Sequence, residues 1–358
     1  MIKQFSWKKI VGLLAVLVLA VFTGQIVFNG ETVIAKEKPK YKKVTLVLNC
    51  ATGRGTDSYA WGKKIAELTK KYTDGRVRVK VFARGEVYKT YHDISKALFS
   101  GGSDMMINVH SSFVTAGVKK YGIFAVPGLL VPSPEEKFFG ERVNRFWKDP
   151  KGGGVLRREC EAKGVKLIGD IAETFPVVLF FKKALMKDEV KGLKLRVAAS
   201  KGYRLVMEHL GIVAVPVPYA DTYTGLQQGL IDGAVTGTQY YNSGKWYEVC
   251  PYVMEMPINT ITLTLAANLK KWNSLSEQLR DLLENVVAPE AHQYVTELID
   301  SKMMTMKSEL EGKGVTFYRW PDEEIKALDS WYPQCWNQFR TDYGDALVDT
   351  AIRARNLR

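Results

Sequence analysis

The sequence lacks the short motifs that mark the common catalytic sites. It contains no P-loop, no G-x-S-x-G nucleophile elbow and no H-E-x-x-H zinc motif, and Gly53-Arg54-Gly55 supplies only the first half of a G-x-G-x-x-G pattern. The four histidines, His92, His110, His209 and His292, stand at unrelated spacings. These absences disfavour an enzyme, and the sequence predicts no catalytic residue, no metal site and no cofactor.

Cysteine is scarce as well. The four cysteines, Cys50, Cys160, Cys250 and Cys335, lie far apart and form no C-x-x-C pair, which argues against a zinc site. In an oxidising compartment they allow up to two disulfides, with three possible full pairings. Four buried free thiols are equally compatible with the sequence.

The chain has no long run of basic residues, although it is basic. Lys plus Arg (51) exceed Asp plus Glu (38), but this excess is spread along the sequence with only short pairs such as Lys119-Lys120. This spread favours a solvated basic surface and predicts no nucleic-acid partner. A length of 358 residues with 46% hydrophobic and 25% charged residues excludes a disordered or polytopic membrane protein and suggests about two domains.

The amino terminus has the order of a secretory signal. Three lysines precede an uninterrupted apolar run, Ile10–Phe22, and Val33-Ile34-Ala35 offers residues that a signal peptidase reads. We therefore expect residues 1–35 to be a signal peptide, a mature start near Lys36, and a periplasmic location. Counted on through Phe28, the same run of about 19 residues would just span a bilayer, so an uncleaved anchor is the alternative.

From Lys42 onward, apolar strand patterns alternate with helical patterns, which predicts an α/β fold. The polar loops after Leu48 and Ile107 carry Asn49, Asn108 and Ser112. Small ligands bind at such loops in open α/β sheets, but the same residue types also cap helices, so both interpretations stay open. The predicted strands of this first part are Val44–Leu48, Val77–Val81 and Met105–Val109, and its helices run from about Trp61 to Leu68 and from Tyr91 to Phe99.

The second part of the chain repeats the alternation and ends in helices. A helical pattern over Ser276–Leu310 is interrupted by Pro289, which predicts a long kinked helix that could bridge two lobes. Trp331, Trp336 and Phe339 mark a helical tail packed against the body. The predicted strands are Val165–Ile168, Val177–Phe181, Leu193–Val197, Val213–Val217 and Ile258–Ala266, and the shorter helices are Gly202–Leu210 and Ala220–Gln228.

Two segments of the second part are the most specific. Gly192–Val197 reads G-L-K-L-R-V, and Ala220–Gly233 reads A-D-T-Y-T-G-L-Q-Q-G-L-I-D-G. In this order and separation they resemble the substrate-binding proteins of tripartite ATP-independent periplasmic (TRAP) transporters, the DctP type. The likeness extends over nearly the whole mature chain, through Thr73–Phe82, Gly85–Val87, Ala97–Gly101, Val126–Leu130 and Lys271–Leu275.

The resemblance implies a two-lobed periplasmic-binding-protein-like fold, the Venus flytrap, with crossing strands and a long lobe-spanning helix. We expect lobe I to comprise residues 42–172 plus about 260–300, and lobe II residues 173–259 plus about 301–358 with the helical tail. The implied function is an extracytoplasmic solute receptor that binds a small organic acid by hinge closure and delivers it to TRAP membrane permease subunits. An exported enzyme on the same fold and a membrane-anchored ligand sensor are the alternatives.

The resemblance also assigns roles to particular residues. Arg196, the arginine of the G-L-K-x-R strand, is expected to bind the ligand carboxylate, because a guanidinium presents paired donors that match its two oxygens. Tyr219 and Thr236 are expected to line the pocket, with Asn49 from the other lobe and Asn108 and Ser112 as further candidates.

The sequence departs from the family pattern at two places, and one of them is Ala198, which stands where the family usually has a proline after R-V. Many acid-binding relatives carry a further arginine on the strand entering the second lobe, where Glu173, Phe175 and Pro176 stand here. The missing arginine predicts a monocarboxylate with an apolar or aromatic body, with Phe175, Tyr219 and Tyr240 as walls. A modified amino acid and a sulfonate are the alternatives.

Overall fold

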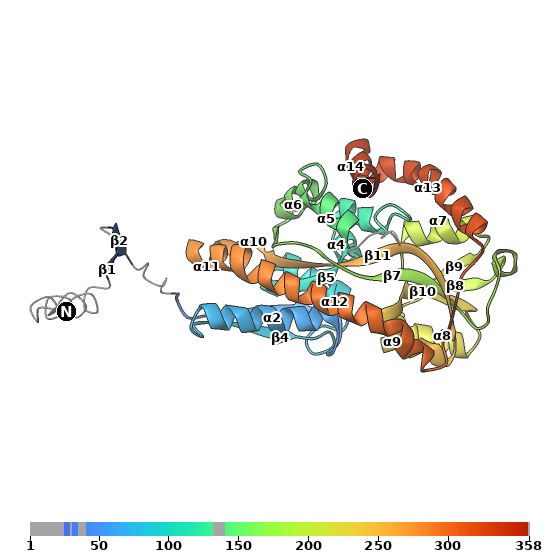
Figure 1. The fold of residues 1–358 in the computed structure, drawn as a ribbon, viewed down its shortest axis with the longest axis horizontal. Coiled ribbons are helices and arrows are strands. Elements are labelled where there is room, and N and C mark those ends of the chain that lie inside the picture. Colours follow the sequence, from blue (N-terminus) through green and yellow to red (C-terminus); the bar gives the residue numbers. More distant parts are fainter. Residues whose placement is uncertain (1–24, 29–30, 35–40, 132–139, 357–358) are drawn as a thin grey trace, which may run out of the picture. The chain divides into compact units, whose positions relative to one another are not determined.

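The computed structural model describes residues 25–28, 31–34, 41–131 and 140–356 (Figure 1), and the side chains of Glu173, Phe175 and Pro257 are not described. The chain divides into two compact units, Met1–Tyr41 and Lys42–Arg358. In the first unit, β1 (Gln25–Phe28) pairs antiparallel with β2 (Glu31–Ile34). The apolar run Ile10–Phe22 lies outside the described residues.

The described ranges hold no helix that is both long enough and apolar enough to cross a membrane. Phe28, where the longer count of the apolar run ends, lies in strand β1. The signal peptide and the uncleaved anchor both stay predictions.

The second unit is built on one ten-stranded mixed sheet, with the order β4-β3-β5-β11-β7-β10-β8-β9 and with β12 and β6 paired to β11. Three parallel strands at one end, β3, β4 and β5, form what we call the first strand group. Three at the other end, β8, β9 and β10, form the second strand group and are also parallel to one another. Their bounds are β3 Val44–Cys50, β4 Val77–Phe82, β5 Met105–Val109, β8 Lys194–Val197, β9 Val213–Pro216 and β10 Gly233–Gly237.

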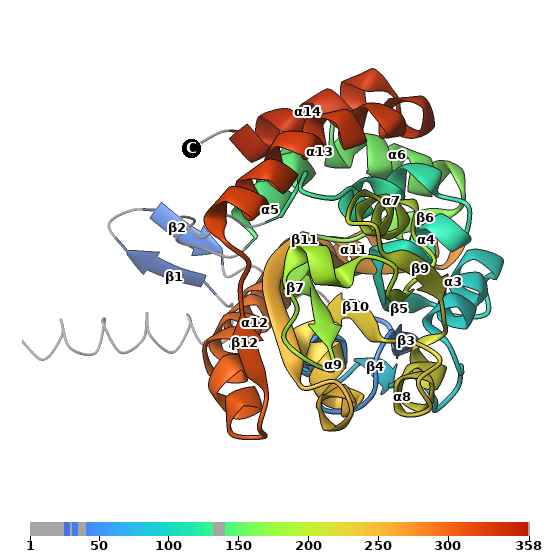
Figure 2. The same cartoon turned by 90° about the vertical axis from the view of Figure 1, so that its right-hand side faces the viewer.

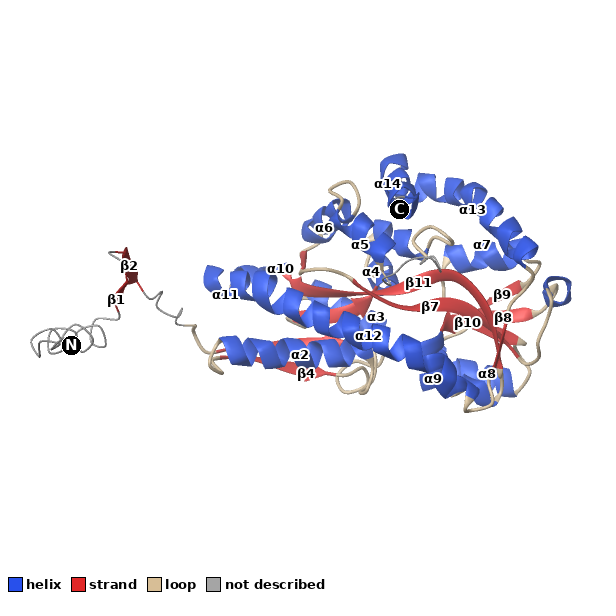
Figure 3. Cartoon of the chain, viewed as in Figure 1, coloured by secondary structure: helices blue, strands red, loops and turns tan. Residues whose placement is uncertain are grey.

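Two long antiparallel strands connect the strand groups. Strand β7 (Ala172–Phe181) and the 17-residue β11 (Tyr252–Asn268) run side by side through the middle of the sheet (Figure 3). The pairing register shifts between Met254 and Asn259 and again between Thr260 and Thr262. Pro257 lies within the first shift, and since proline has no backbone N–H it fits a gap in the ladder. The predicted crossing strands are therefore confirmed, and each is longer than its apolar pattern indicated.

The predicted long helix is present, but it is not a simple kinked helix. Helix α11 (Glu277–Leu282) continues through a π-helical turn, η5 (Leu283–Val287), into α12 (Ala288–Glu311), with Pro289 in the first turn of α12. A proline has no backbone N–H to donate, and its ring crowds the preceding turn of the helix. The wider π-helical turn directly before Pro289 accommodates both the missing hydrogen bond and the ring. Helix α12 packs against α2 (Asp57–Tyr72) and reaches α9 (Thr238–Ser243), so it runs from the first strand group toward the second (Figure 1).

The remaining helices cover the sheet, and the tail helices pack beside α5 and η1 (Figure 2). The predicted helical tail is thus confirmed, as two helices. The bounds are α3 Tyr91–Ser100, α4 His110–Thr115, η1 Lys119–Ala125, α5 Glu141–Lys148, α6 Gly153–Ala162, η2 Lys187–Val190, α7 Lys201–His209, η3 Tyr219–Asp221, α8 Thr222–Gln227, η4 Trp246–Glu248, α10 Leu269–Asn273, α13 Asp322–Tyr343 and α14 Asp345–Asn356, and the short strands are β6 Val165–Leu167 and β12 Thr316–Tyr318.

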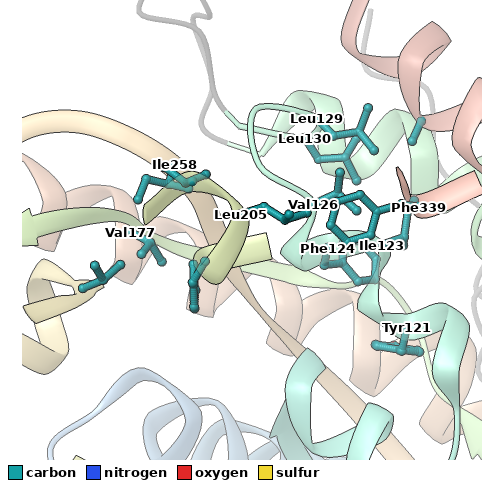
Figure 4. Packing of buried hydrophobic residues seen from close by; sticks show 14 of the residues in the cluster. Tyr121, Ile123, Phe124, Val126, Leu129, Leu130, Val177, Leu205, Ile258 and Phe339 are labelled. Atoms are coloured by element: carbon teal, nitrogen blue, oxygen red, sulfur yellow. The ribbon is translucent and has the colours of Figure 1, made fainter. Parts of the chain in front are cut away.

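Two clusters of the hydrophobic core contain residues of the crossing strands. The larger joins η1, α7, the crossing strands and the tail helices, and Figure 4 shows Leu205 of α7 beside Val126 and Phe124. The smaller cluster contains Phe180 of β7 and Trp246, and Phe180 stacks on Tyr241 with ring centroids 4.0 Å apart. Because β7 contributes to both clusters, the crossing strands are anchored in both.

The start of α7 approaches the chain after η1 too closely for a larger residue. A Cβ atom added to Gly202 would lie 2.1 Å from the carbonyl oxygen of Ala125. We expect Gly202→Ala to lower the free energy of unfolding by about 1–3 kcal/mol, because the backbone must move apart to admit the methyl group. The measurement is urea unfolding followed by circular dichroism.

Gly154→Ala is the matched control. Gly154 lies in helix α6, and the nearest atom to a Cβ added there is 3.5 Å away. Alanine in an open helical position stabilises by up to about 1 kcal/mol. Equal behaviour of the two variants would contradict the close packing of Gly202.

All four cysteines are free and buried. Burial raises the pKa of each thiol, which disfavours the reactive thiolate. We expect the folded protein to resist iodoacetamide, and all four thiols to react after unfolding without reductant, as counted by mass spectrometry. Two or more residues that react only after reduction would instead show a disulfide.

Candidate functional site

Arg196 lies in β8, between Ala234 of β10 and Val215 of β9. Its side chain is only 5% exposed. The Nε group donates a hydrogen bond to the carbonyl oxygen of Val217 at 2.9 Å, and Nη1 donates to that of Val235 at 3.2 Å. Two backbone carbonyls of the neighbouring strands therefore fix the orientation of the guanidinium.

The charge of Arg196 has no acidic partner. No carboxylate among the described residues forms an ion pair with it, and the guanidinium carbon lies 5.5 Å from the centroid of the Trp246 ring. Burial lowers the pKa of Arg196, and nearby tyrosines oppose that shift. An arginine stays protonated even so, which leaves a buried positive charge without a counterion. Such a charge is unfavourable until an anion reaches it.

Aromatic side chains surround this charge. Tyr219 in η3 donates a hydrogen bond from its hydroxyl to the carbonyl oxygen of Tyr240 at 2.7 Å, and its ring lies 5.1 Å from that of Trp246. Tyr91 of α3 and Tyr203 of α7 also lie near enough to act on Arg196 electrostatically. Burial raises the pKa of Tyr219, Tyr240 and Tyr203, the last to about 12, so these phenols are neutral donors at physiological pH.

Thr236 shares a face of the sheet with Arg196. It lies in β10, two residues after Ala234, which pairs with Arg196. Side chains two residues apart on a strand point to the same face, so Thr236 and Arg196 project to the same side. Thr236 is 7% exposed. The structure therefore brings together Arg196, Tyr219 and Thr236, three of the residues expected in the pocket.

The candidate side chains from the first part of the chain form hydrogen bonds with other groups of the protein. The amide of Asn49 donates to Ser103 Oγ at 2.8 Å. The amide of Asn108 donates to the carbonyl oxygen of Tyr91 and to Ser95 Oγ, and its oxygen accepts from the N–H of Val109. Ser112 donates to the carbonyl oxygen of Val109 at 2.7 Å, inside the first turn of α4.

Phe175 lies in β7, but its side chain is outside what the structure describes. None of the contacts described for Asn49, Asn108 or Ser112 joins them to Arg196. Within the described ranges, no group of three His, Cys, Asp or Glu side chains is arranged to hold a metal ion.

The sequence analysis missed Tyr91, Tyr203 and Trp246, which lie near Arg196, and Arg84, which lies beside Tyr219. Trp246 follows no strand end or motif, so no local signal identifies it. Arg84 is different, because it comes two residues after the end of β4, and Asn49 is the penultimate residue of the neighbouring strand β3. The rule that polar residues at the carboxyl ends of parallel strands line ligand sites applies to this loop as well.

A family model, described as bacterial extracellular solute-binding protein, family 7 (DctP), matches residues 51–342. The chain belongs to this family. The chain is 25% identical over 339 residues to the C4-dicarboxylate-binding periplasmic protein DctP of Vibrio cholerae, covering 91% of this chain and 99% of that protein. The resemblance identified from Gly192–Val197 and Ala220–Gly233 is therefore confirmed.

Solved structures of TRAP periplasmic solute-binding proteins share the fold. One from Shewanella oneidensis with bound succinate superimposes with a TM-score of 0.76 at 20% identity, covering 87% of this chain and 99% of that one. Another from Sulfitobacter sp. NAS-14.1 with bound β-D-galacturonate superimposes with a TM-score of 0.76 at 16% identity, covering 87% of this chain and 100% of that one. The family 7 chain described here thus has the two-lobed periplasmic-binding fold, as expected from its sequence.

The side-chain amide of Asn108 makes hydrogen bonds within the protein, which suggests a structural role. We expect Asn108→Ala to lower the free energy of unfolding by about 1–3 kcal/mol, because three buried groups lose a hydrogen-bond partner. Ligand affinity, measured by calorimetry on the folded variant, should stay within a few-fold of the wild-type value. A large loss of affinity with unchanged stability would instead place Asn108 in contact with the ligand.

Proposed function

We propose that this family 7 protein is a periplasmic receptor that binds a small organic acid through Arg196 and presents it to a TRAP membrane permease. The observation that carries the proposal is the buried guanidinium of Arg196, which lacks a carboxylate partner among the described residues. An anionic ligand supplies the missing countercharge.

The hydrogen bonds of Arg196 leave room for such a ligand. A guanidinium has five N–H donors, and the backbone carbonyls of Val217 and Val235 accept from two groups, Nε and Nη1. No partner among the described residues is assigned to Nη2. A carboxylate that accepts from the unused donors forms a charge-assisted bond in a site with little competing water. We propose that Tyr219 and Thr236 line the same pocket, with Asn49 and Phe175 as further contacts.

The crossing strands suit a hinge. The register shifts at Met254–Asn259 and Thr260–Thr262 interrupt the β7–β11 ladder between the two strand groups. Local breaks in pairing concentrate bending where few backbone bonds must change. We propose lobe I as residues 42–172 plus about 260–300 and lobe II as residues 173–259 plus about 301–358, with closure about these shifts.

The relatives support the ligand class and the location. The Shewanella oneidensis and Sulfitobacter proteins hold succinate and galacturonate, which are both organic acids. The Vibrio cholerae relative is named a periplasmic binding protein, in line with the signal-like amino terminus here. These relatives are solute-binding proteins, which supports a receptor that does not alter its ligand.

Thermal unfolding with a panel of organic acids tests the proposal. Succinate, L-malate and galacturonate are the first probes, together with simple monocarboxylates. A ligand at about 100 times its Kd adds roughly 2.7 kcal/mol to the free energy of unfolding. We expect at least one acid to stabilise the wild type, and Arg196→Lys to remove most of that shift while circular dichroism shows a folded protein.

Arg204→Lys is the matched control, since Arg204 lies on α7 with an exposed ion pair to Glu208. Its ligand-induced shift should equal that of the wild type. Full ligand affinity in Arg196→Lys would remove the proposed carboxylate clamp, because a lysine has no fork of paired donors.

A further inference from the structure

A second arginine faces the same aromatic cluster from the first strand group. Arg84 follows β4, and its backbone N–H donates to the carbonyl oxygen of Thr52 at 3.1 Å. Its side chain is half-buried, and the guanidinium carbon lies 5.8 Å from the centroid of the Tyr219 ring. Tyr219 therefore contacts a guanidinium contributed by the first strand group.

Neighbouring acids do not neutralise Arg84. Glu86, two residues on, accepts from Arg54 Nε at 2.7 Å and from the N–H of Ala83 at 2.9 Å. Buried Asp57 pairs with Lys302 of α12 at 2.8 Å. Within the described ranges no carboxylate forms an ion pair with Arg84, so its positive charge is uncompensated.

Arg84 and Arg196 act on the same group. Both guanidiniums lower the pKa of Tyr219, against the dominant effect of burial. Arg84 faces the ring of Tyr219 and Arg196 faces the ring of Trp246, and these two rings are 5.1 Å apart. Asp57 is paired with Lys302, and neither Arg84 nor Arg196 forms an ion pair with a described carboxylate.

We propose that Arg84 is a second anion-binding residue, so that the receptor selects a ligand with two negatively charged groups. This inference rests on the proposed function and deepens it. One group of the ligand binds Arg196 and the other binds Arg84, across the ring of Tyr219. The sequence suggested a single anionic group because β7 carries no arginine, whereas the structure offers the second cation from the loop after β4.

The charge balance argues against a zwitterionic ligand. An ammonium group needs an anion to neutralise it, and Lys302 already neutralises the charge of Asp57, the buried carboxylate described beside this cluster, whose Oδ2 has no hydrogen-bond partner. A second anionic group instead finds an unpaired guanidinium with a fixed aromatic neighbour. Because Arg84 and Arg196 come from different strand groups, a ligand that binds both also joins the two groups.

Matched pairs of acids test the inference by calorimetry on the full mature protein. Each pair differs in one carboxylate: butyrate and succinate, pentanoate and glutarate, benzoate and terephthalate. We expect the wild type to prefer the diacid of at least one pair by about tenfold or more. Arg84→Gln should abolish that preference while leaving the monoacid affinity within a few-fold, and Arg84→Lys should restore part of it.

Arg78→Gln is the matched control, because Arg78 lies exposed on the preceding strand and its loss changes the net charge by the same amount. It should leave the diacid preference intact. The role of Arg84 is overturned if the wild type binds the monoacid of every pair as tightly as the diacid, or if Arg84→Gln keeps the diacid preference. Either result leaves the carboxylate-binding role of Arg196 intact. Absence of Arg196-dependent binding for every acid overturns both.

Discussion

The candidate site is organised around one unfavourable arrangement, a buried guanidinium that forms no ion pair with any described carboxylate. Arg196 is held by two backbone carbonyls and faces Trp246, and neither contact supplies a negative charge. Removing a charge from water costs several kcal/mol unless a counterion replaces the lost hydration. The fold tolerates this cost because β8 and its neighbours fix the side chain from both sides. The same cost becomes part of the driving force when an anion binds.

The rest of the fold explains how such a site can open and close. Two parallel strand groups are joined through β7 and β11, and the breaks in their pairing lie between the groups. Both described clusters of the core contain residues of β7, while the register of the β7–β11 ladder shifts between the two strand groups. Helix α12 begins directly after a π-helical turn and reaches from α2 to α9, so it spans the same boundary.

Local patterns predicted much of this, and their failures have a physical cause. Alternating apolar residues located the strands, and the G-L-K-L-R-V segment located Arg196, because its position depends only on its own strand. Trp246 and Tyr91 were missed because they meet Arg196 through tertiary packing, which leaves no trace in local spacing. Pro289 signalled an interruption, but whether a helix breaks, bends or widens there depends on what packs against it. Asn108 fits its pattern equally as a ligand contact or a structural bond, and only its partners distinguish the two.

On the proposed roles of Arg84 and Arg196, ligand binding is coupled to closure of the two strand groups. Two unit charges about 10 Å apart at an effective dielectric of about 20 repel by roughly 2 kcal/mol, and water between them weakens that repulsion. Arg84 and Arg196 come from different strand groups, so bringing the groups together without a ligand moves like charges toward each other in a drier environment. An anion between them reverses the sign of this interaction. A receptor built this way resists empty closure and closes on a suitable ligand, because the ligand interacts more favourably with the closed form than with the open one.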